Sequence, residues 1–338
     1  MLLNKINLKL DTNVLISIII PTYNRASVIK DTLNSIISQT YIYWYCLIVD
    51  DGSNDDSIKI IENYAIKDKR FKLLERPKSK PKGANACRNF GLEQAKGDFV
   101  VFFDSDDYMY PEYLELQLKN IQEIKANYSI CKCEWVTKNG KIIDGFHGGI
   151  LESNNRINDY ISFKAFWHIN SVIYKSLFLK ENELIFDESL QQSQEYDFHV
   201  KVMQIDSNYA ILPNTLVRVI ASEDSISFSK TNAFVKAYSS LRVRYSFLKN
   251  KNLKLNQTTC VFLLHDMHRI FMQQSIEKNR KVSLFAAYYY LKGHFCRKEI
   301  ASKYFLKHVF PVLGAFLMYS MFNKGYIFLK KSNTFNYS

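Results

Sequence analysis

Short apolar runs alternate with segments of helical periodicity along the first third of the chain. Residues 16–21, Ile-Ser-Ile-Ile-Ile-Pro, are apolar, mostly β-branched and closed by a proline, which predicts a buried strand. From Ala26 to Ser38 the apolar residues recur at helical spacing, which predicts an amphipathic helix. The same alternation continues, with strands expected over residues 45–49, 71–74 and 100–103 and helices expected from about residue 58 and over about 84–95.

Strands that alternate with helices at this spacing form right-handed βαβ units. We therefore expect an α/β fold with a parallel or mixed sheet flanked by helices. Polar residues follow the expected strands, and they are Thr22, Asn24, Arg25, Asp50, Asp51, Arg76, Asp104 and Asp106. All lie beyond carboxyl ends of strands, the edge at which open α/β sheets bind ligands, most often nucleotides. The chain has neither a G-x-G-x-x-G sequence nor a Walker loop, which argues against a dinucleotide fold and a P-loop enzyme.

The expected strand at residues 100–103 runs directly into three carboxylates, Asp104, Asp106 and Asp107. Carboxylates spaced Asp-x-Asp at a strand end can share a hard divalent cation, whose other positions are left for water and the oxygens of a diphosphate. Solvated turns and helix caps show the same spacing. The aspartates therefore mark a candidate metal site, which the rest of the chain has to support.

The composition fits a globular protein of one or two domains, because 338 residues with 47% hydrophobic content can bury a sizeable core. No stretch reaches the roughly 20 apolar residues that span a bilayer, and the start does not read as a signal peptide. We therefore expect a cytoplasmic protein. Its six cysteines have no regular spacing, which favours reduced thiols over a disulfide framework.

The net charge of +12 is concentrated in the last third of the chain. Residues 230–338 carry 19 Lys or Arg and 3 Asp or Glu, whereas residues 1–229 carry 26 and 30. We expect a catalytic domain over 1–229 and a helical, basic region over 230–338. This region suits an anionic membrane surface or a nucleic acid, although a basic helical face can also be merely solvated. Within it, residues 309–322 predict either an interfacial helix or one that closes the core.

Four linked segments resemble, in order and spacing, the family 2 glycosyltransferases of the GT-A fold. They are Ile-Ile-Ile-Pro-Thr-Tyr-Asn-Arg at 18–25, Ile-Val-Asp-Asp-Gly-Ser at 48–53, Gly-Ala-Asn-Ala-Cys-Arg-Asn-Phe-Gly at 83–91 with Ala-Lys-Gly at 95–97, and Phe-Asp-Ser-Asp-Asp at 103–107. The resemblance covers roughly residues 14–220. The basic region is not part of it.

The resemblance implies a nucleotide-sugar pocket at this edge of the sheet. Asp50 and Asp51 would hold the base and ribose, although a turn with an Asx cap explains them as well. The other residues implied are Thr22, Tyr23 and Arg25 in the same pocket and Arg88 beside the diphosphate, where a guanidinium is well suited. An ordinary surface arginine is the alternative for Arg88.

The resemblance also implies a Mn²⁺ or Mg²⁺ ion at the aspartates. Asp106 matches the direct metal ligand, and Asp104 would reach the ribose or a metal-bound water. Such an ion would neutralise charge that develops on the leaving nucleoside diphosphate.

An inverting transfer needs a base that takes the proton of the acceptor hydroxyl. In Ser193-Gln-Glu-Tyr-Asp, Glu195 falls on the family's base position, and Asp197 is a second candidate that helix capping explains nearly as well. The family usually has Glu-Asp or Gln-Asp here, so the longer glutamate must reach differently. Residues expected to border the acceptor are Trp167, His168 and Asn170, with a core role for Trp167 as the alternative.

Together these features predict an inverting, metal-dependent hexosyl- or N-acetylhexosaminyltransferase. It would use a nucleoside diphosphate sugar, by resemblance a UDP-sugar, and a glycan or lipid-linked glycan acceptor at the inner face of the cytoplasmic membrane. Capsule, lipopolysaccharide or similar surface polysaccharide biosynthesis would be its setting, with no nucleic-acid partner. Two alternatives stay open: a nucleotidyltransferase that makes the sugar nucleotide, and a nucleic-acid- or membrane-binding protein with an inactive sheet domain.

Overall fold

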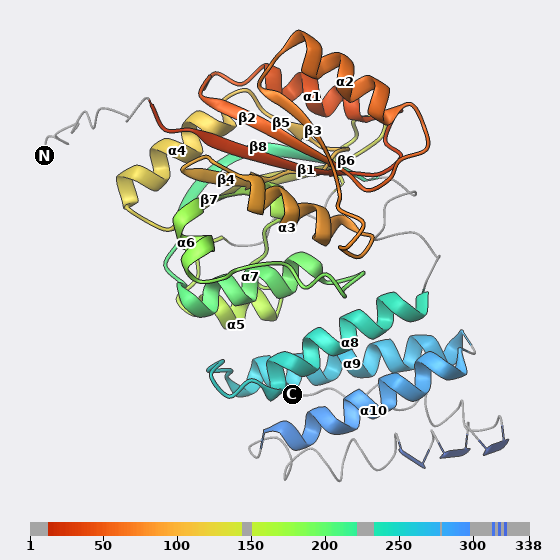
Figure 1. Ribbon diagram of the computed structural model, residues 1–338. Helices are drawn as coiled ribbons and strands as arrows, with labels where there is room; N and C mark the ends of the chain where they lie inside the picture. Colours follow the sequence, from red (N-terminus) through yellow and green to blue (C-terminus); the bar gives the residue numbers. More distant parts are fainter. Residues whose placement is uncertain are drawn as a thin grey trace, which may run out of the picture. The chain divides into compact units, whose positions relative to one another are not determined.

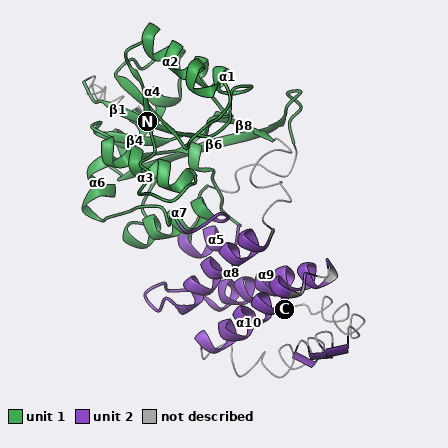
Figure 2. Ribbon diagram, turned by 45° about the vertical axis from the view of Figure 1, so that its right-hand side comes forward, with its two compact units in different colours: residues 1–156, 164–188, 194–228 green, residues 157–163, 189–193, 229–338 purple. Residues whose placement is uncertain are grey.

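The computed structural model describes residues 13–143, 151–221, 233–277 and 279–297, together with the short pieces 313–314, 317–318 and 321–322. The chain forms two compact units (Figure 2). The first contains residues 1–156, 164–188 and 194–228; the second contains residues 157–163, 189–193 and 229–338. The second unit thus takes two short segments from the middle of the chain as well as its end. A catalytic domain that stops at residue 229 stays a prediction.

The first unit is built on one mixed sheet (Figure 1), whose strand order is β3-β2-β1-β4-β7-β6-β8-β5. The strands are β1 (Ile16–Thr22), β2 (Trp44–Asp50), β3 (Phe71–Glu75), β4 (Phe99–Phe102), β5 (Tyr108–Met109), β6 (Tyr128–Thr137), β7 (Val172–Lys175) and β8 (Ala210–Ala221). Strands β3, β2, β1 and β4 pair with one another in parallel. Strand β7 is antiparallel to both β4 and β6. The expected α/β fold with a mixed sheet is confirmed.

Helices connect and cover these strands. They are α1 (Ile29–Ile37), α2 (Ser57–Lys67), α3 (Ala84–Gln94), α4 (Tyr113–Ile124), α5 (Arg156–Ile161), α6 (Ser176–Glu181) and α7 (Gln194–Ile205), with a short 3₁₀ turn, η1 (Ile169–Ser171). The alternation expected up to β4 is confirmed, with strand ends displaced by one or two residues. The periodic apolar positions are therefore a reliable guide to this half of the sheet.

Strand β1 lies at the centre of the core, with all seven of its residues buried. Its side chains alternate between two helix-covered faces, which is why the strand is apolar throughout. Ile18 and Ile20 join a core cluster that includes Leu33 of α1 and Ile61 of α2. Ile19 faces α3, where Gly91 has no side chain to keep the helix away from the strand. This close approach fixes the helix that carries Arg88.

The second unit consists largely of three helices, α8 (Ala233–Lys249), α9 (Gln257–Ile276) and α10 (Arg280–Cys296). Arg244 of α8 forms a buried ion pair with Asp266 of α9. Asn256 caps α9 by accepting a hydrogen bond from the Thr259 N–H at 2.8 Å. The expected helices after residue 233 are confirmed, but most of the apolar segment 309–322 lies outside the described residues. Among the described helices, none combines the length and apolar character needed to cross a bilayer.

The Gly91→Ala variant tests the packing of α3 on β1. The new Cβ would lie 2.4 Å from Cγ2 of Ile19, so helix and strand must separate. We expect the free energy of unfolding in urea to fall by about 1–3 kcal/mol, because overpacking outweighs the gain in helix propensity. Gln94→Ala, at an exposed position of the same helix, is the control and should change it by less than about 0.5 kcal/mol. An equally stable Gly91→Ala protein would contradict this packing.

Candidate active site

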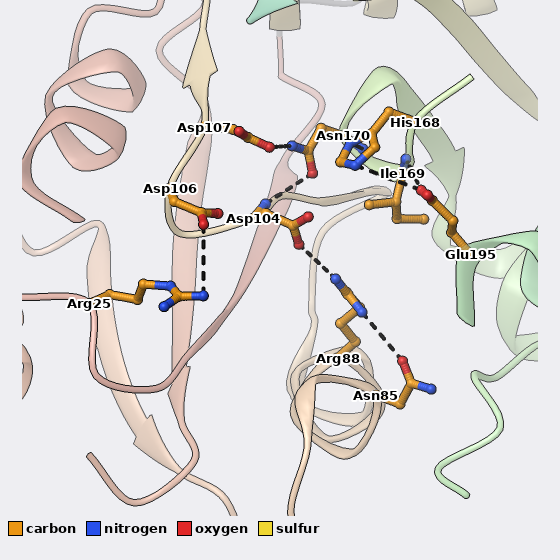
Figure 3. Close-up of polar contacts among 10 residues, drawn as sticks. All are labelled: Arg25, Asn85, Arg88, Asp104, Asp106, Asp107, His168, Ile169, Asn170 and Glu195. Carbon is orange, nitrogen blue, oxygen red and sulfur yellow. Dashed lines mark hydrogen bonds and ion pairs between the residues drawn. The ribbon is translucent and has the colours of Figure 1, made fainter. Parts of the chain in front are cut away.

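The carboxyl ends of β1, β2 and β4 meet at one edge of the sheet, because these strands are parallel and adjacent. Thr22 ends β1, Asp50 ends β2, and Asp104 follows β4 after one residue. The edge therefore collects the polar residues that the sequence places after each strand. The close-up in Figure 3 shows the part of this edge built around the aspartates.

The loops after β1 and β2 are held together by side-chain hydrogen bonds. Asn24 adopts a left-handed conformation, with φ of 51°, which asparagine tolerates better than most residues. Its N–H donates to Oγ of Ser53, and its side-chain oxygen accepts from the N–H of Asn54, both at 2.9 Å. These bonds join the two loops at this edge of the sheet.

The two aspartates after β2 have different partners. Asp50 accepts hydrogen bonds from the N–H groups of Gly52 and Ser53, each at 2.8 Å, and so stabilises its own turn. Asp51 is buried and forms an ion pair with Arg76, which follows β3. The turn-capping alternative therefore describes Asp50, whereas Asp51 is held in place by a cation from another strand end.

Three other predicted residues lie on the same loops. The Thr22 side chain is 2% exposed, and its hydroxyl has no hydrogen-bond partner among the described residues. An unpaired buried hydroxyl is costly unless a ligand satisfies it. Tyr23 is 41% exposed and packs under the ammonium group of Lys82, 3.8 Å from the ring centre. Arg25 reaches the carboxylates, where its guanidinium lies 3.7 Å from Asp106.

Each of the three aspartates after β4 has its own partner. Asp104 accepts a 2.6 Å hydrogen bond from Arg88 of α3, and Arg88 also donates to Asn85 at 3.3 Å. Asp106 faces Arg25, and both side chains are 26% exposed. Asp107 is buried and accepts bonds from the N–H of Ile220 at 2.8 Å and the amide of Asn170 at 2.5 Å. Figure 3 shows these three aspartates pointing toward different partners.

Burial and neighbouring charges shift the pKa values of these three aspartates in different directions. Burial alone would raise the pKa of Asp104, but the positive charge of Arg88, with smaller contributions from His168 and Arg25, holds the pKa below the ordinary value. Burial and the charge of Asp104 raise the pKa of Asp106. Burial, with the charges of Asp106 and Asp104, raises the pKa of Asp107 further. Asp104 is therefore the most firmly ionised of the three.

A metal ion could be held by Asp104, Asp107 and His168, whose ligand atoms all lie within 4.8 Å of one another. Two carboxylates and an imidazole form a donor set that suits Mn²⁺, and the carboxylates also suit Mg²⁺. Asp106, the residue expected as direct ligand, is outside this group and faces Arg25 instead. Its assignment to the metal stays a prediction. Asp107 received no role from the sequence, although the third carboxylate of Asp-x-Asp-Asp was its signal.

Glu195 lies in the first turn of α7 with its carboxylate directed toward His168 and Ile169 (Figure 3). It accepts a hydrogen bond from the Ile169 N–H at 2.8 Å, and Nε2 of His168 is 4.0 Å away. Its side chain is 28% exposed, so a ligand can reach it. Asp197, the second candidate base, is instead paired with Lys201 at 2.6 Å and mostly buried. The geometry favours Glu195.

The three residues expected at the acceptor have different surroundings in the structure. His168 lies beside Glu195, but Trp167 is 1% exposed and packs against Tyr209 with ring centres 5.0 Å apart. Asn170 is fully buried. The burial of Trp167 agrees with its alternative role in the core, and the acceptor role of these three residues stays a prediction. The half-buried Trp135 of β6, with its ring edge-on to His168 at 5.7 Å, is an aromatic residue that the sequence analysis missed.

Comparison with known proteins identifies the family. A family model described as glycosyl transferase family 2 matches residues 17–179. This part of the chain is a family 2 glycosyltransferase domain. It contains the loops after β1, β2 and β4 and the η1 turn, so most of the site belongs to the matched segment, whereas Glu195 lies beyond it.

Individual relatives agree with this assignment. An uncharacterized glycosyltransferase of Haemophilus influenzae is 41% identical over 125 residues, 36% of this chain and 49% of that protein. The putative teichuronic acid biosynthesis glycosyltransferase TuaG of Bacillus subtilis is 34% identical over 132 residues, 39% of this chain and 52% of that protein. Poly(ribitol-phosphate) beta-N-acetylglucosaminyltransferase TarS of Staphylococcus aureus is 30% identical over 190 residues, 55% of this chain and 32% of that protein. This chain thus spans about half or less of each relative.

The fold is also that of a solved structure. Residues 1–349 of S. aureus TarS, crystallised in complex with UDP-GlcNAc, superpose with a TM-score of 0.68 at 22% sequence identity. The match covers 94% of this chain and 90% of that one. At this level of identity the likeness establishes a shared GT-A fold.

The Arg88→Met variant tests the electrostatic support of Asp104. Because Arg88 lowers the pKa of Asp104 in the folded protein, the pair stabilises the fold at neutral pH and loses its effect as pH falls through that pKa. We expect the free energy of unfolding of the variant to be about 2–3 kcal/mol lower than that of the wild type at neutral pH. The difference should shrink as the pH falls below about 4.

Lys119→Met provides the control for this experiment. It removes an exposed pair with Glu123 whose charged atoms are 4.0 Å apart, with side chains 53% and 43% exposed. Its free energy of unfolding should change by less than about 1 kcal/mol at neutral pH. A difference for Arg88→Met that stays constant across the pH range would mean that Asp104 is not the group stabilised.

Proposed function

We propose that this chain is a metal-dependent, inverting glycosyltransferase that moves a sugar from a nucleoside diphosphate sugar to a hydroxyl of a glycan or lipid-linked glycan. The observation that carries this proposal is the position of His168. It contributes to the potential metal-binding group with Asp104 and also lies 4.0 Å from the carboxylate of Glu195. A base and a diphosphate-binding group are thus adjacent, as direct displacement at the anomeric carbon requires.

In the proposed reaction, Glu195 accepts the proton of the acceptor hydroxyl as its oxygen attacks the anomeric carbon. The new bond joins that oxygen to the carbon, and the bond between the carbon and the diphosphate oxygen breaks on the opposite side. The sugar inverts its configuration, and the nucleoside diphosphate leaves with the electron pair. A Mn²⁺ or Mg²⁺ ion held by Asp104 with Asp107 and His168, or with Asp106, would supply electrostatic stabilisation of that leaving group. Arg88 and Arg25 add positive charge on the same side.

The proposed donor is a UDP-sugar, either a hexose or an N-acetylhexosamine. Support comes from TarS, whose solved structures of this fold include complexes with UDP-GlcNAc and with UDP. In this chain, Asp51 paired with Arg76 and the buried Thr22 hydroxyl offer polar groups for a nucleoside. The names of TuaG and TarS, which refer to teichuronic acid and poly(ribitol-phosphate), support a role in surface polysaccharide biosynthesis. Capsule or lipopolysaccharide assembly is the corresponding proposal here.

The two rival functions have less support. A nucleotidyltransferase has no need of a base beside the metal-binding group, and the matched family is one of glycosyltransferases. An inactive sheet domain in a nucleic-acid-binding protein would have little reason to keep Glu195 accessible beside His168 and Asp104. The basic region is better explained by a membrane surface.

A contact between the second unit and an anionic membrane surface is proposed from α10. Leu284, Tyr288 and Phe295 are 51%, 48% and 67% exposed and lie on one face of the helix. Lys281 and Lys292 flank this face, and the Lys292 ammonium lies 4.5 Å from the Tyr288 ring centre. Exposed apolar side chains between lysines are typical of helices that lie at a lipid interface. This position would bring the enzyme to a lipid-linked acceptor at the inner face of the cytoplasmic membrane.

The catalytic proposal is tested by measuring released nucleoside diphosphate across a panel of donors, with Mn²⁺ or with EDTA. We expect metal-dependent hydrolysis of one donor by the wild type. The Glu195→Gln variant should lose about 10²–10⁴-fold in kcat, because general base catalysis is removed, while its KM for the donor changes little. The Asp104→Asn variant should lose metal dependence together with activity.

Glu181→Gln, at an exposed position near the end of α6, is the matched control and should keep wild-type kinetics. Calorimetry with UDP and Mn²⁺ on the wild type separates binding from turnover. A protein that hydrolyses no donor and binds no UDP would refute the transferase proposal. An active Glu195→Gln variant would refute the role of the base.

The membrane proposal is tested with the double variant Leu284→Glu, Phe295→Glu in the full chain. Binding to vesicles of phosphatidylcholine with phosphatidylglycerol should weaken by about tenfold or more, because buried apolar area is lost and negative charge is added. Ile66→Glu, on α2 at a residue that is 69% exposed, should bind as the wild type does. Equal binding of all three proteins would contradict the assignment, and tighter retention on DNA than on vesicles would favour the nucleic-acid rival.

A further inference from the structure

The η1 turn lies between the two functional parts of the site (Figure 3). On one side, the N–H of Ile169 donates to the carboxylate of Glu195 at 2.8 Å. On the other, the side chain of the next residue, Asn170, reaches the aspartate loop. Consecutive residues of one short turn therefore contact the candidate base and the candidate metal-binding loop.

Both the oxygen and the nitrogen of the Asn170 amide form hydrogen bonds with that loop. Its oxygen accepts a hydrogen bond from the backbone N–H of Asp104 at 3.0 Å. Its nitrogen donates to the carboxylate of Asp107 at 2.5 Å. The side chain is completely buried, so these bonds are formed away from competing water. Only an amide side chain combines an acceptor and a donor in this geometry, which explains an asparagine here better than an acceptor-binding role does.

The turn and the loop are each anchored independently. The carbonyl of Ser171 accepts a 2.9 Å bond from the side chain of Gln117 in α4, and its N–H donates to the carbonyl of His168 at 2.9 Å. The carbonyl of Asp107 accepts from the Thr32 hydroxyl at 2.8 Å, and its carboxylate accepts from the N–H of Ile220 at 2.8 Å. Asn170 thus joins two rigid segments.

We propose that Asn170 is a positioning residue that sets the spacing between the metal-binding loop and the Glu195 carboxylate. The inference rests on the proposed function, since it assumes a donor diphosphate near Asp104 and a base at Glu195. The acceptor oxygen is oriented from Glu195, and the anomeric carbon is held through the diphosphate. Direct displacement requires these two atoms to meet at about 3–3.5 Å, and a shift of about 1 Å can cost about 10²-fold in rate. Asn170 holds the aspartate loop at a fixed distance from the turn that binds Glu195 before substrate binds.

The test compares Asn170→Ala with a matched variant, Asn158→Ala. Asn158 is also buried, at 5% exposure, and has the same bonding pattern. Its oxygen accepts from the N–H of Asn256 at 2.9 Å, and its nitrogen donates to the carbonyl of Lys254 at 3.1 Å. Both variants lose an amide that joins two backbone segments, but only one of these amides touches the aspartate loop.

We expect the amide of Asp104 to exchange with deuterium at least about tenfold faster in Asn170→Ala than in wild type, because its acceptor is lost. Asn158→Ala should leave this exchange unchanged. With the donor found above, kcat of Asn170→Ala should fall by about 10²-fold. The KM for the donor should stay within about threefold, because the nucleoside pocket is intact. Unchanged exchange or unchanged kcat in a folded Asn170→Ala protein would overturn the proposal.

A double variant, Asn170→Asp with Asp107→Asn, keeps the test decisive if Asn170→Ala does not fold. This double variant again has one amide and one carboxylate at the two positions, but with their places reversed. The N–H groups of Asp104 and Ile220 then still have acceptors. Recovery of at least about tenfold in kcat over Asn170→Asp alone would support positioning. If this variant still binds UDP with Mn²⁺, a protected Asp104 amide without any recovery of kcat would mean that the spacing held by residue 170 does not set the rate, and would overturn the proposal.

The two proposals fail in different ways. If the wild-type protein hydrolyses no donor, the transferase function fails, whereas deuterium exchange still reports on whether Asn170 holds the loop. If the wild type is active and Asn170→Ala is equally active, the transferase function stands and only the positioning role falls.

Discussion

The site depends on compensating the carboxylates that follow a buried strand. Strand β4 is followed by Asp104, whose side chain is 24% exposed, and by Asp107, which is buried. An unpaired charge at the buried position would cost several kcal/mol, by general estimates for buried ions. Arg88 neutralises the first, and hydrogen bonds from Asn170 and the Ile220 N–H satisfy the second. These partners come from α3, η1 and β8, so the aspartate loop determines how distant parts of the first unit must be arranged around it.

The parallel half of the sheet is predictable because each of its strands and helices shows its pattern within a short stretch of sequence. A strand buried on both faces is apolar throughout, and the helix that follows shows its own period within a dozen residues. Polar residues at the strand ends, such as Asp50 and Asp104, then fall at one edge by geometry alone. The sequence therefore predicts both the elements of this half and the edge at which the candidate site residues meet. The periodicity of residues 233–249 likewise predicts α8.

The other half of the sheet, from β7 to β5, is less predictable because its strand pairs join residues far apart in the chain. Trp167 and Trp135 are both aromatic residues near polar neighbours, yet one is buried against Tyr209 and the other lies edge-on to His168. Nothing local distinguishes them, since the choice depends on how β6 and β7 pair. The same holds for Asp106 and Asp107, which are adjacent in sequence but point toward different partners.

The second unit is discontinuous in sequence, which has a consequence for how this protein can be shortened or recombined. Residues 189–193 belong to it, and the N–H of Gln191 donates to Ser239 of α8 at 3.1 Å. The very next residues begin α7, the helix that carries Glu195. A chain cut at residue 229 would leave residues 157–163 and 189–193 without the unit they pack in. A gene fusion that exchanges the helical unit would therefore have to exchange residues 157–163 and 189–193 together with residues 229–338.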